Sequence, residues 1–399
     1  MKNYLIIGHG AAGTEAALTL RKQVPDSLVT VLTDEPYLPS FRPRLVHYLA
    51  EDTPPESLLV HDAAWYATNG ITIRTATKVS ALDSAAHTVT TNTGAVITYD
   101  RLLLATGSLP FVPPLPGREL PGVFTLRTIE DCQRIKEHVR NCASVLVIGG
   151  GLLGLESAYS LRKLGKEVTV VETAPWLLPR QLDAEGGRHL QRLLEAQGLR
   201  FVLGDQAAAI EGNPGEGKVK CVRLKAGSCV DAEAVIVSIG IRPDIAWLAS
   251  SGIKLNRGIV VDDNLASSDP DIWAAGDVCE HKGVCQGLWI SAREQGRIAA
   301  LNMAGVATGY QASPPVSQLK ITGIDVFSSM SFDTATLGNE GDGANPDQTI
   351  LAARNPEFYR KLIMRTDGDV QGIMVIGDKT AIQTARKILA GTARPEDFI

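Results

Sequence analysis

Short apolar runs alternate with amphipathic stretches along most of the chain. Residues 4–7 and 28–32 are apolar runs of strand length, and residues 14–22 between them have the spacing of an amphipathic helix. The same order of strand, helix and strand returns at residues 145–171. Strands that alternate with helices in this way predict an α/β protein with parallel sheets.

A glycine turn joins the first strand of each repeat to its helix. The turns read IIGHGAAGTE at residues 6–15 and VIGGGLLGLE at residues 147–156, and both have the spacing Gly-x-Gly-x-x-Gly. The first glycine permits a tight bend, the second lets the backbone approach a pyrophosphate, and the third lets the helix pack on the strand. The N–H groups at the helix start then bind the diphosphate. The glycines concerned are Gly8, Gly10 and Gly13 in the first turn and Gly149, Gly151 and Gly154 in the second.

An acidic residue follows the second strand of each repeat. Asp34 and Glu35 follow the first of these strands, and Glu172 follows the second. A carboxylate at this position accepts hydrogen bonds from ribose hydroxyls, and it repels the 2′-phosphate of NADP, so we expect NADH to be preferred at the second site. Two dinucleotide sites in one chain are useful if they exchange electrons, which predicts FAD at one and NAD(H) at the other.

Proline and glycine clusters divide the chain into domains. Residues 107–122 contain five prolines and predict a semi-rigid linker between domains. The chain is predicted to cross from one domain to the next again at residues 237–244 and 311–318. Beyond the last crossing the pattern changes to extended runs, with a hairpin signal at TDGD (366–369) and a final helix from about 380 to 389. The predicted domains are residues 1–115 and 241–312 for FAD, residues 116–240 for NAD, and residues 313–399 as a C-terminal domain.

The composition narrows the choice of partners. The chain has 399 residues and a net charge of −5, which gives no basic stripe for nucleic acid or anionic lipid. The apolar run at the amino terminus is too short for a signal peptide, and no stretch approaches the roughly 20 apolar residues of a membrane helix. We therefore expect a cytoplasmic protein that binds small molecules or proteins, and neither nucleic acid nor a membrane.

The cysteines and histidines give no sign of a metal site. None of the six cysteines stands in CxxC or CxxxxC spacing, so we expect buried, reduced thiols rather than a zinc site or a redox-active disulfide. Cys279 and Cys285 flank a short loop and are close enough in sequence to meet, but we expect them only to pack. The seven histidines are scattered without metal-ligand spacing, so no metal is expected.

Three further motifs carry a resemblance to a known family. They are LLLATGS at residues 102–108, VIVSIGIRPD at residues 235–244 and DPDIWAAGDV at residues 269–278. Together with the two glycine turns, they resemble the two-dinucleotide-binding flavoproteins of the pyridine nucleotide-disulfide oxidoreductase superfamily. The resemblance implies two Rossmann-like domains, with the NAD domain inserted in the FAD domain, and a small C-terminal α+β domain.

The resemblance also implies roles for residues within these motifs. Asp277, which follows Gly276, is expected to bind the ribityl chain of the flavin. The first motif is expected to form a strand and turn beside the flavin, and the second to return the chain from the NAD domain. The residues of these two motifs that we expect in the cofactor sites are Ala105, Thr106, Gly107 and Gly240.

Two comparisons indicate the branch of this superfamily. Disulfide reductases carry CxxxxC on the helix after the first glycine turn, where this chain reads TEAALTLRK. The segments PSFRPRLVHYL (39–49) and YRKLIMRTDGDVQGIMVIGD (359–378) instead resemble the NADH:rubredoxin reductases and the amino-terminal flavin half of nitrite reductase large subunits. This resemblance implies hydride transfer from NADH to flavin N5 and then electron transfer to an external one-electron iron centre.

Three side chains are expected to act near the reacting rings. Glu156 resembles a family glutamate that faces the flavin, and we expect it to orient the nicotinamide or to interact with His47; the helix dipole alone also favours a glutamate there. A cation at Arg42 or His47 would stabilise the anionic reduced ring. Pro43 restricts the backbone at Arg42, which is also a candidate for cofactor binding. Lys320 is a weaker candidate.

Several functions agree with these features. The leading one is an FAD-dependent oxidoreductase that moves electrons between NADH and a carrier protein of rubredoxin or iron–sulfur type. The second is the FAD subunit of a larger complex that exchanges electrons between NAD and a subunit with an iron–sulfur, tungsten or other metal cofactor. A redox-sensing binding flavoprotein and an NADH oxidase are further alternatives. The acceptor, the direction of electron flow and the oligomeric state stay open.

Overall fold

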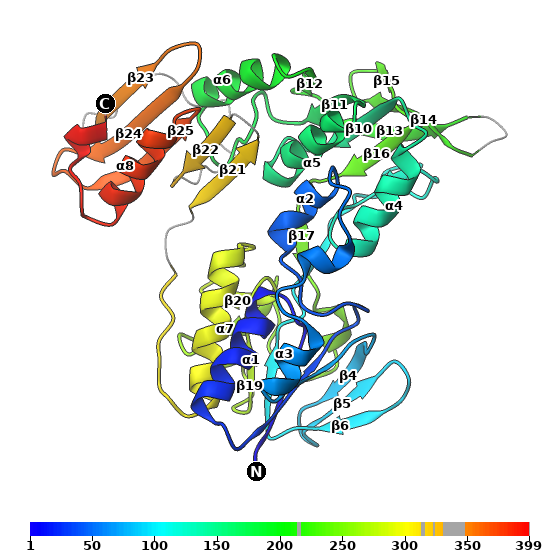
Figure 1. The fold of residues 1–399 in the computed structure, drawn as a ribbon, viewed down its shortest axis with the longest axis vertical. Helices are drawn as coiled ribbons and strands as arrows, with labels where there is room; N and C mark the ends of the chain where they lie inside the picture. The colour runs from blue at the N-terminus through cyan, green and yellow to red at the C-terminus, as the bar shows by residue number, and fades with distance from the viewer. Residues whose placement is uncertain (214–216, 313–315, 322–323, 330–347, 399) are drawn as a thin grey trace. The chain divides into compact units, whose positions relative to one another are not determined.

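The protein forms two compact units, and each is built from segments that lie far apart in the sequence (Figure 1). The computed structural model describes residues 1–399 except 214–216, 313–315, 322–323, 330–347 and 399. The predicted α/β class is confirmed, whereas the three predicted domain boundaries stay a prediction. Unit 1 comprises Met1–Leu45, Thr53–Pro110 and Gly240–Ser313, and unit 2 comprises Val46–Asp52, Phe111–Ile239 and Pro314–Ile399.

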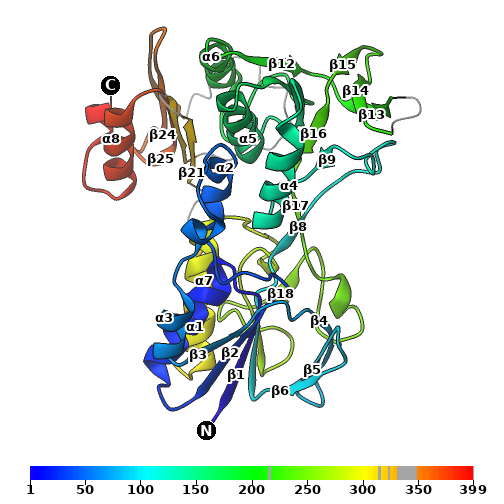
Figure 2. The ribbon, with the colours of Figure 1, turned by 45° about the vertical axis from the view of Figure 1, so that its right-hand side comes forward.

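Unit 1 is built on a five-stranded parallel sheet with the strand order β19-β7-β1-β2-β3. The central strand, β1 (Asn3–Ile7), is almost entirely buried because a parallel sheet is covered on both faces. Helices α1 (Ala11–Gln23) and α7 (Trp289–Met303) pack side by side in both views (Figures 1 and 2). The other strands are β2 (Leu28–Leu32), β3 (Ile71–Arg74), β7 (Arg101–Leu104) and β19 (Ile272–Ala274).

Smaller elements complete unit 1. An antiparallel sheet contains β4 (Val79–Asp83), β5 (Thr88–Thr91) and β6 (Val96–Thr98). The pair β8 (Ser108–Pro110) and β17 (Ile241–Pro243) is antiparallel, and the pair β18 (Ile259–Val261) and β20 (Cys279–His281) is parallel. The short helices are η1 (Arg42–Arg44), η2 (Pro55–Leu58), α3 (Ala63–Thr68) and η3 (Ala246–Leu248), and α2 (Leu45–Tyr48) leads into the first segment of unit 2.

Unit 2 contains a second five-stranded parallel sheet, with the order β12-β11-β10-β16-β9. Its central strand, β10 (Ser144–Ile148), lies between β11 and β16 as β1 lies between β2 and β7, so the sequence repeat is a structural repeat. The remaining elements are β9 (Val123–Phe124), α4 (Ile129–Val139), α5 (Leu152–Lys163), β11 (Glu167–Glu172), α6 (Ala184–Glu195), β12 (Leu199–Leu203), β16 (Ala234–Val237) and an antiparallel sheet of β13 (Ala207–Gly212), β14 (Val219–Leu224) and β15 (Cys229–Asp231).

The C-terminal part of unit 2 is an antiparallel sheet with the order β21-β22-β25-β24-β23. The hairpin predicted at TDGD joins β24 to β25 and is confirmed, as is the final helix, α8. Within the ranges described above, no helix is long and apolar enough to cross a membrane. The elements are β21 (Ser317–Ile321), β22 (Ile324–Ser328), β23 (Gln348–Arg354), β24 (Tyr359–Arg365), β25 (Val370–Ile376), α8 (Lys379–Leu389) and η5 (Pro395–Phe398).

A buried carboxylate links this C-terminal sheet to α6. Asp183 caps α6 by accepting a hydrogen bond from the Gly186 N–H at 2.8 Å. It also accepts one from the Tyr359 hydroxyl at 3.0 Å and one from Lys361 Nζ at 2.6 Å. Burial and the adjacent carboxylate raise the pKa of Tyr359, so its hydroxyl stays a donor. The buried charge is therefore paired and hydrogen-bonded, as it must be away from water.

The crossing of α1 and α7 gives the first prediction. A Cβ atom at Gly296 would lie 2.1 Å from the backbone oxygen of Ala12, so we expect Gly296→Ala to force the helices apart and to lower the free energy of unfolding by roughly 1–3 kcal/mol. Urea denaturation followed by circular dichroism measures this loss. Gly309→Ala is the matched control, because a Cβ there would meet no described atom within 4 Å. Equal stability of the two variants would contradict the prediction.

Candidate functional site: two dinucleotide cradles

The first glycine turn packs backbone directly against backbone. Gly8 has φ +100°, and a Cβ atom there would lie 2.1 Å from the Ala105 oxygen. A Cβ at Gly13 would lie 1.9 Å from the Gly8 oxygen, so no side chain fits at either position. At Gly10 a Cβ would meet no described atom within 4 Å. Gly10 is the N-cap residue of α1, and because it has no side chain it makes no capping hydrogen bond to the first N–H groups of the helix. Uncapped N–H groups beside open space fit the pyrophosphate of a dinucleotide.

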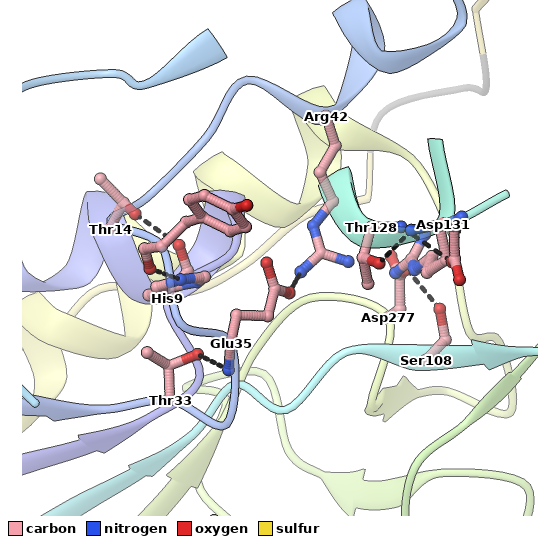
Figure 3. Close-up of polar contacts among 11 residues, drawn as sticks. His9, Thr14, Thr33, Glu35, Arg42, Ser108, Thr128, Asp131 and Asp277 are labelled. Carbon is pink, nitrogen blue, oxygen red and sulfur yellow. Dashed lines mark hydrogen bonds and ion pairs between the residues drawn. The ribbon is translucent and has the colours of Figure 1, made fainter. Parts of the chain in front are cut away.

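An ion pair holds the acidic residue at the end of β2. The Glu35 carboxylate pairs with the Arg42 guanidinium, and the Glu35 N–H donates to Thr33 Oγ1 at 3.2 Å (Figure 3). The Glu35 and Arg42 side chains are only 13% and 22% exposed, whereas Asp34 is exposed. Arg42 thus contacts the carboxylate that we predicted to bind ribose. The cofactor-binding role and the role at the reacting ring both stay predictions for Arg42.

His9 joins the glycine turn to the loop after β2. No signal in the sequence singled it out, because it stands at a variable position of the glycine motif. The ring is 3% exposed, and Nε2 lies 3.0 Å from the Tyr37 carbonyl oxygen. Burial lowers the pKa of His9, so the neutral ring donates from Nε2 to that oxygen. The His9 carbonyl accepts from Thr14 Oγ1 at 2.8 Å, which fixes the turn from the helix side as well (Figure 3).

The predicted ribityl-binding aspartate is held in place by a residue far away in the sequence. Ser108 Oγ donates to Asp277 Oδ2 at 2.7 Å, across 169 positions of the chain (Figure 3). The N–H of the neighbouring Gly276, which has φ +84°, donates to Gln295 Oε1 at 2.8 Å. A carboxylate fixed in this way accepts hydrogen bonds from hydroxyl groups such as those of a ribityl chain. The contacts of Ser108 and Gln295 were not predicted, although Ser108 ends the LLLATGS motif.

The two predicted crossing segments meet within unit 1. Thr106 Oγ1 donates to the Asp244 carbonyl oxygen at 3.3 Å, and the Asp244 N–H donates to the Gly107 oxygen at 3.1 Å. Gly240 begins the returning segment with φ +121°, a value that disfavours other residues. Burial raises the pKa of the Asp244 carboxyl group. The motifs LLLATGS and VIVSIGIRPD therefore form one connected structure.

The second glycine turn repeats the geometry of the first. A Cβ at Gly149 would lie 2.2 Å from the Ser238 oxygen, and a Cβ at Gly154 would lie 2.0 Å from the Gly149 oxygen. At Gly151, the N-cap of α5, a Cβ would meet no described atom within 4 Å. Both turns therefore have an open second glycine between two glycines that admit no side chain. The duplicated motif in the sequence is a duplicated cradle in the structure.

Two backbone amides hold the acidic residue of the second cradle. Glu172 Oε2 accepts from the Gly150 N–H at 2.7 Å, and Oε1 accepts from the Ala174 N–H at 2.8 Å. These contacts place the carboxylate beside the glycine turn, where the adenosine ribose of a dinucleotide lies in such folds. Neutral amides orient the carboxylate without cancelling its charge. Glu172 therefore differs from Glu35, whose charge is balanced by Arg42.

Two helices hold the segment that carries His47. Ser160 Oγ on α5 donates to the Val46 carbonyl oxygen at 2.5 Å. Lys136 Nζ on α4 donates to the Glu51 carbonyl oxygen at 2.5 Å. Ser160 lies one helical turn beyond the partly buried Glu156, so both side chains share one side of α5. Val46, the residue before the exposed His47, is therefore hydrogen-bonded to α5 one helical turn from Glu156. The side chain of Lys320 lies outside the part of the chain that the structure describes.

The cysteines require a correction. Cys221 and Cys229 form a disulfide between β14 and β15, so the expectation of reduced thiols is wrong for this pair. A spacing of eight residues fits no motif, and only the hairpin register brings the two together. The cysteines that remain free are Cys132, Cys142, Cys279 and Cys285, and the loop between the last two does not close into a disulfide. Burial raises the pKa of Cys132 to about 12, which keeps that thiol protonated.

Comparison with known proteins identifies a matching family. The family model described as pyridine nucleotide-disulphide oxidoreductase matches residues 2–304. The NADH-rubredoxin oxidoreductase of Clostridium acetobutylicum is 30% identical over 374 residues, which cover 94% of this chain and 90% of that protein. Among solved structures, the ferredoxin reductase for the CYP199A2 system of Rhodopseudomonas palustris superposes with a TM-score of 0.86 at 25% identity, covering 99% of this chain and 96% of that one.

A larger enzyme also matches. The NAD(P)H nitrite reductase of Bacillus subtilis (strain 168) is 35% identical over 387 residues, which cover 95% of this chain and 46% of that protein. The chain therefore spans just under half the length of this relative. More than half of the nitrite reductase lies outside the match, so its whole activity does not carry over to this chain.

The buried imidazole of His9 gives the second prediction. Its pKa is lowered in the folded state, so the folded protein binds fewer protons at this site than the unfolded chain does. The free energy of unfolding should therefore fall as the pH falls from 7 to 5, through the ordinary histidine pKa of about 6.5. We expect His9→Asn to flatten this dependence, measured by urea denaturation at several pH values. His47→Asn, at an exposed histidine, is the control and should keep the wild-type slope; a wild-type slope in His9→Asn would contradict the assignment.

Proposed function

The chain belongs to the pyridine nucleotide-disulphide oxidoreductase family, and we propose that it is an FAD-dependent oxidoreductase that passes electrons from NADH to a one-electron carrier of rubredoxin or ferredoxin type. That family uses FAD and NAD(P)H. The observation that carries the proposal is the duplicated cradle, in which both turns exclude a Cβ at the first and third glycines and leave space at the second. The match over 90% of the length of an NADH-rubredoxin oxidoreductase supports the carrier class.

The FAD site is assigned to the first cradle. We assign the pyrophosphate to the N–H groups at the start of α1 beside Gly10, and the adenosine ribose to Glu35 with its partner Arg42. The ribityl chain is assigned to Asp277, which Ser108 orients. These groups lie at the carboxyl ends of β1, β2, β7 and β19, where open α/β sheets bind their ligands.

The NAD(H) site is assigned to the second cradle, with a preference for NADH. The start of α5 beside Gly151 holds the pyrophosphate in this proposal, and Glu172 accepts the ribose hydroxyls. A 2′-phosphate would meet the negative charge of Glu172, whose two hydrogen bonds come from neutral amides, and this disfavours NADPH. Glu156 and His47 are proposed to orient the nicotinamide, since the segment of His47 is bonded to α5 one turn from Glu156.

The residues named here act mainly by positioning. When bound, FAD accepts a hydride from NADH and releases the electrons one at a time, which links a two-electron donor to a one-electron carrier. Groups that align the bound reactants lower the barrier because the entropy of bringing them together is already lost on binding. Lys136 and Ser160 act through the backbone of residues 46–51 and are positioning residues in this sense.

A second candidate is the FAD subunit of a larger redox enzyme. The match to the nitrite reductase covers 95% of this chain, and it supports a role in which the flavin passes electrons to a further redox centre of such an enzyme. Both candidates share reduction by NADH. They differ in whether a free carrier protein reoxidises the reduced enzyme.

The third prediction separates these two candidates. The purified yellow protein is reduced anaerobically with NADH and mixed rapidly with oxidised rubredoxin, while the flavin absorbance and the bleaching of the carrier are recorded. A free-standing reductase should show fast reoxidation that saturates with carrier concentration. A mixture of NADH and rubredoxin without the enzyme is the control.

Each other outcome of this experiment decides against part of the proposal. Ready reduction by NADH with negligible reoxidation by both rubredoxin and ferredoxin would favour the subunit of a complex. In a parallel aerobic assay without any carrier, rapid consumption of NADH would favour an NADH oxidase. Failure of NADH to reduce the flavin would overturn the proposed function in both forms.

The fourth prediction concerns the choice of NADH. Glu172→Gln keeps an acceptor for one amide but removes the charge, so it should weaken the ribose contact and the repulsion of NADPH together. We expect the ratio of kcat/KM for NADH over NADPH to fall by about tenfold or more, since a hydrogen bond to a charged group contributes about 1.5–3 kcal/mol. Glu167→Gln, on the same strand but 67% exposed, is the control. An unchanged ratio in Glu172→Gln would contradict the assignment of the second cradle.

A further inference from the structure

A cystine joins two strands of the antiparallel sheet β13–β14–β15. The bond links Cys221 on β14 to Cys229 on β15, with the Cα atoms 6.0 Å apart, which lies within the usual range for a disulfide. In the hairpin register Asp231 pairs with Cys221 and Arg223 pairs with Cys229, so both cysteines lie on the same face of the sheet. The crosslink spans the turn between the two strands. It has no part in the function proposed above.

The two cysteine residues differ in their exposure to solvent. Cys221 is 3% exposed and lies among buried side chains of its strand, whereas Cys229 is exposed at the start of β15. A thiolate breaks a disulfide by attacking one sulfur in line with the bond, so access decides which sulfur is attacked. Cys229 is therefore the site of attack, and Cys221 is the leaving group.

A carboxylate lies beside both sulfur atoms. Glu211 on β13 pairs with Cys221 in the register, and its Oε2 lies 3.6 Å from the Cys221 sulfur and 4.0 Å from the Cys229 sulfur. The other oxygen, Oε1, accepts from Arg223 Nε at 2.7 Å. After reduction the Glu211 carboxylate offers an acceptor to both thiols, while Arg223 balances its charge in either state. The surroundings thus accommodate the dithiol as well as the disulfide.

Glu211, Cys221 and Cys229 could also hold a thiophilic metal ion, since their ligand atoms lie within 4.8 Å of one another. Two observations favour the disulfide. The Glu211 carboxylate is already paired with Arg223, whose cation would repel a divalent metal beside it. The sulfur atoms are bonded to each other, and a metal site needs both as thiolates.

We propose that Cys221 and Cys229 form a reversible thiol–disulfide site whose reducing partner is an external dithiol. A thiolate of the partner attacks the Cys229 sulfur, the bond between Cys229 and Cys221 breaks, and Cys221 leaves as a thiolate that takes up a proton. The second thiol of the partner then attacks the mixed disulfide and releases Cys229. Two electrons pass from the partner, which becomes a disulfide, to the cystine, which becomes two thiols.

The first test maps the bond in the full-length flavoprotein. The protein is treated with oxidised glutathione, or with dithiothreitol that is then removed, and is alkylated in denaturant before peptide mass analysis. The linked peptide of Cys221 and Cys229 should be present after the first treatment, absent after the second, and restored by renewed oxidation. Six alkylated cysteines after treatment with oxidised glutathione would overturn the proposal.

The second test uses the difference in exposure, with two variants that both lack the crosslink. Cys221→Ser leaves the exposed Cys229, which should acquire one glutathione at that position from oxidised glutathione. Cys229→Ser leaves the buried Cys221, which should react at least about tenfold more slowly under the same conditions. Peptide mapping separates both positions from the partly exposed Cys285. Equal rates at the two positions would overturn the assigned point of attack.

A metal measurement closes the test. The dithiothreitol-treated protein is incubated with Zn²⁺, desalted and analysed for metal, with the Cys229→Ser variant beside it. The proposal expects the two proteins to retain the same amount of zinc. One additional zinc per chain in the wild type that is released by alkylation would overturn the proposal in favour of a metal site.

Discussion

The close approach of backbone to backbone at the two glycine turns is the constraint on which the functional assignment depends. The Gly8 carbonyl occupies the space of a Cβ at Gly13, and the Ala105 carbonyl occupies the space of a Cβ at Gly8. Because α1 then begins directly against the strand ends, its first N–H groups lie at the edge of the sheet. The acidic residue that follows β2 lies at the same edge. The second turn reproduces this relation with Ser238 in place of Ala105, so one packing rule builds both cradles.

The two cradles are alike in backbone and unlike in charge. Glu35 is paired with Arg42. The pair presents a carboxylate and a guanidinium side by side, which suits the part of a ligand where a ribose adjoins a diphosphate. Glu172 is held by two neutral amides and keeps its charge, which suits a ribose without a 2′-phosphate. The sequence repeat alone makes these carboxylates look equivalent, and their partners separate the flavin site from the nicotinamide site in the proposed function.

Local features were predictable, and contacts between distant segments were not. The glycine turns, the acidic residues after the second strands and the C-terminal hairpin follow from spacing within about ten residues, which backbone sterics largely determine. The bond from Ser108 to Asp277 and the bond from Ser160 to Val46 join positions 169 and 114 residues apart, and no local pattern encodes them. The disulfide was missed for a related reason, since hairpin register decides whether two cysteines meet.

Two carboxylates on opposite faces fix the register of β24. Tyr359 and Lys361 project to one face and bind Asp183, which caps α6, while Arg360 projects to the other face and pairs with Asp378, which caps α8. A slip by one residue would exchange the faces, bring the guanidinium to the buried side and leave both carboxylates with the wrong partners. A buried ion pair adds little net stability, but its loss is costly, so such pairs act against alternative registers. The C-terminal sheet therefore has one favoured attachment to the part of unit 2 that carries α6.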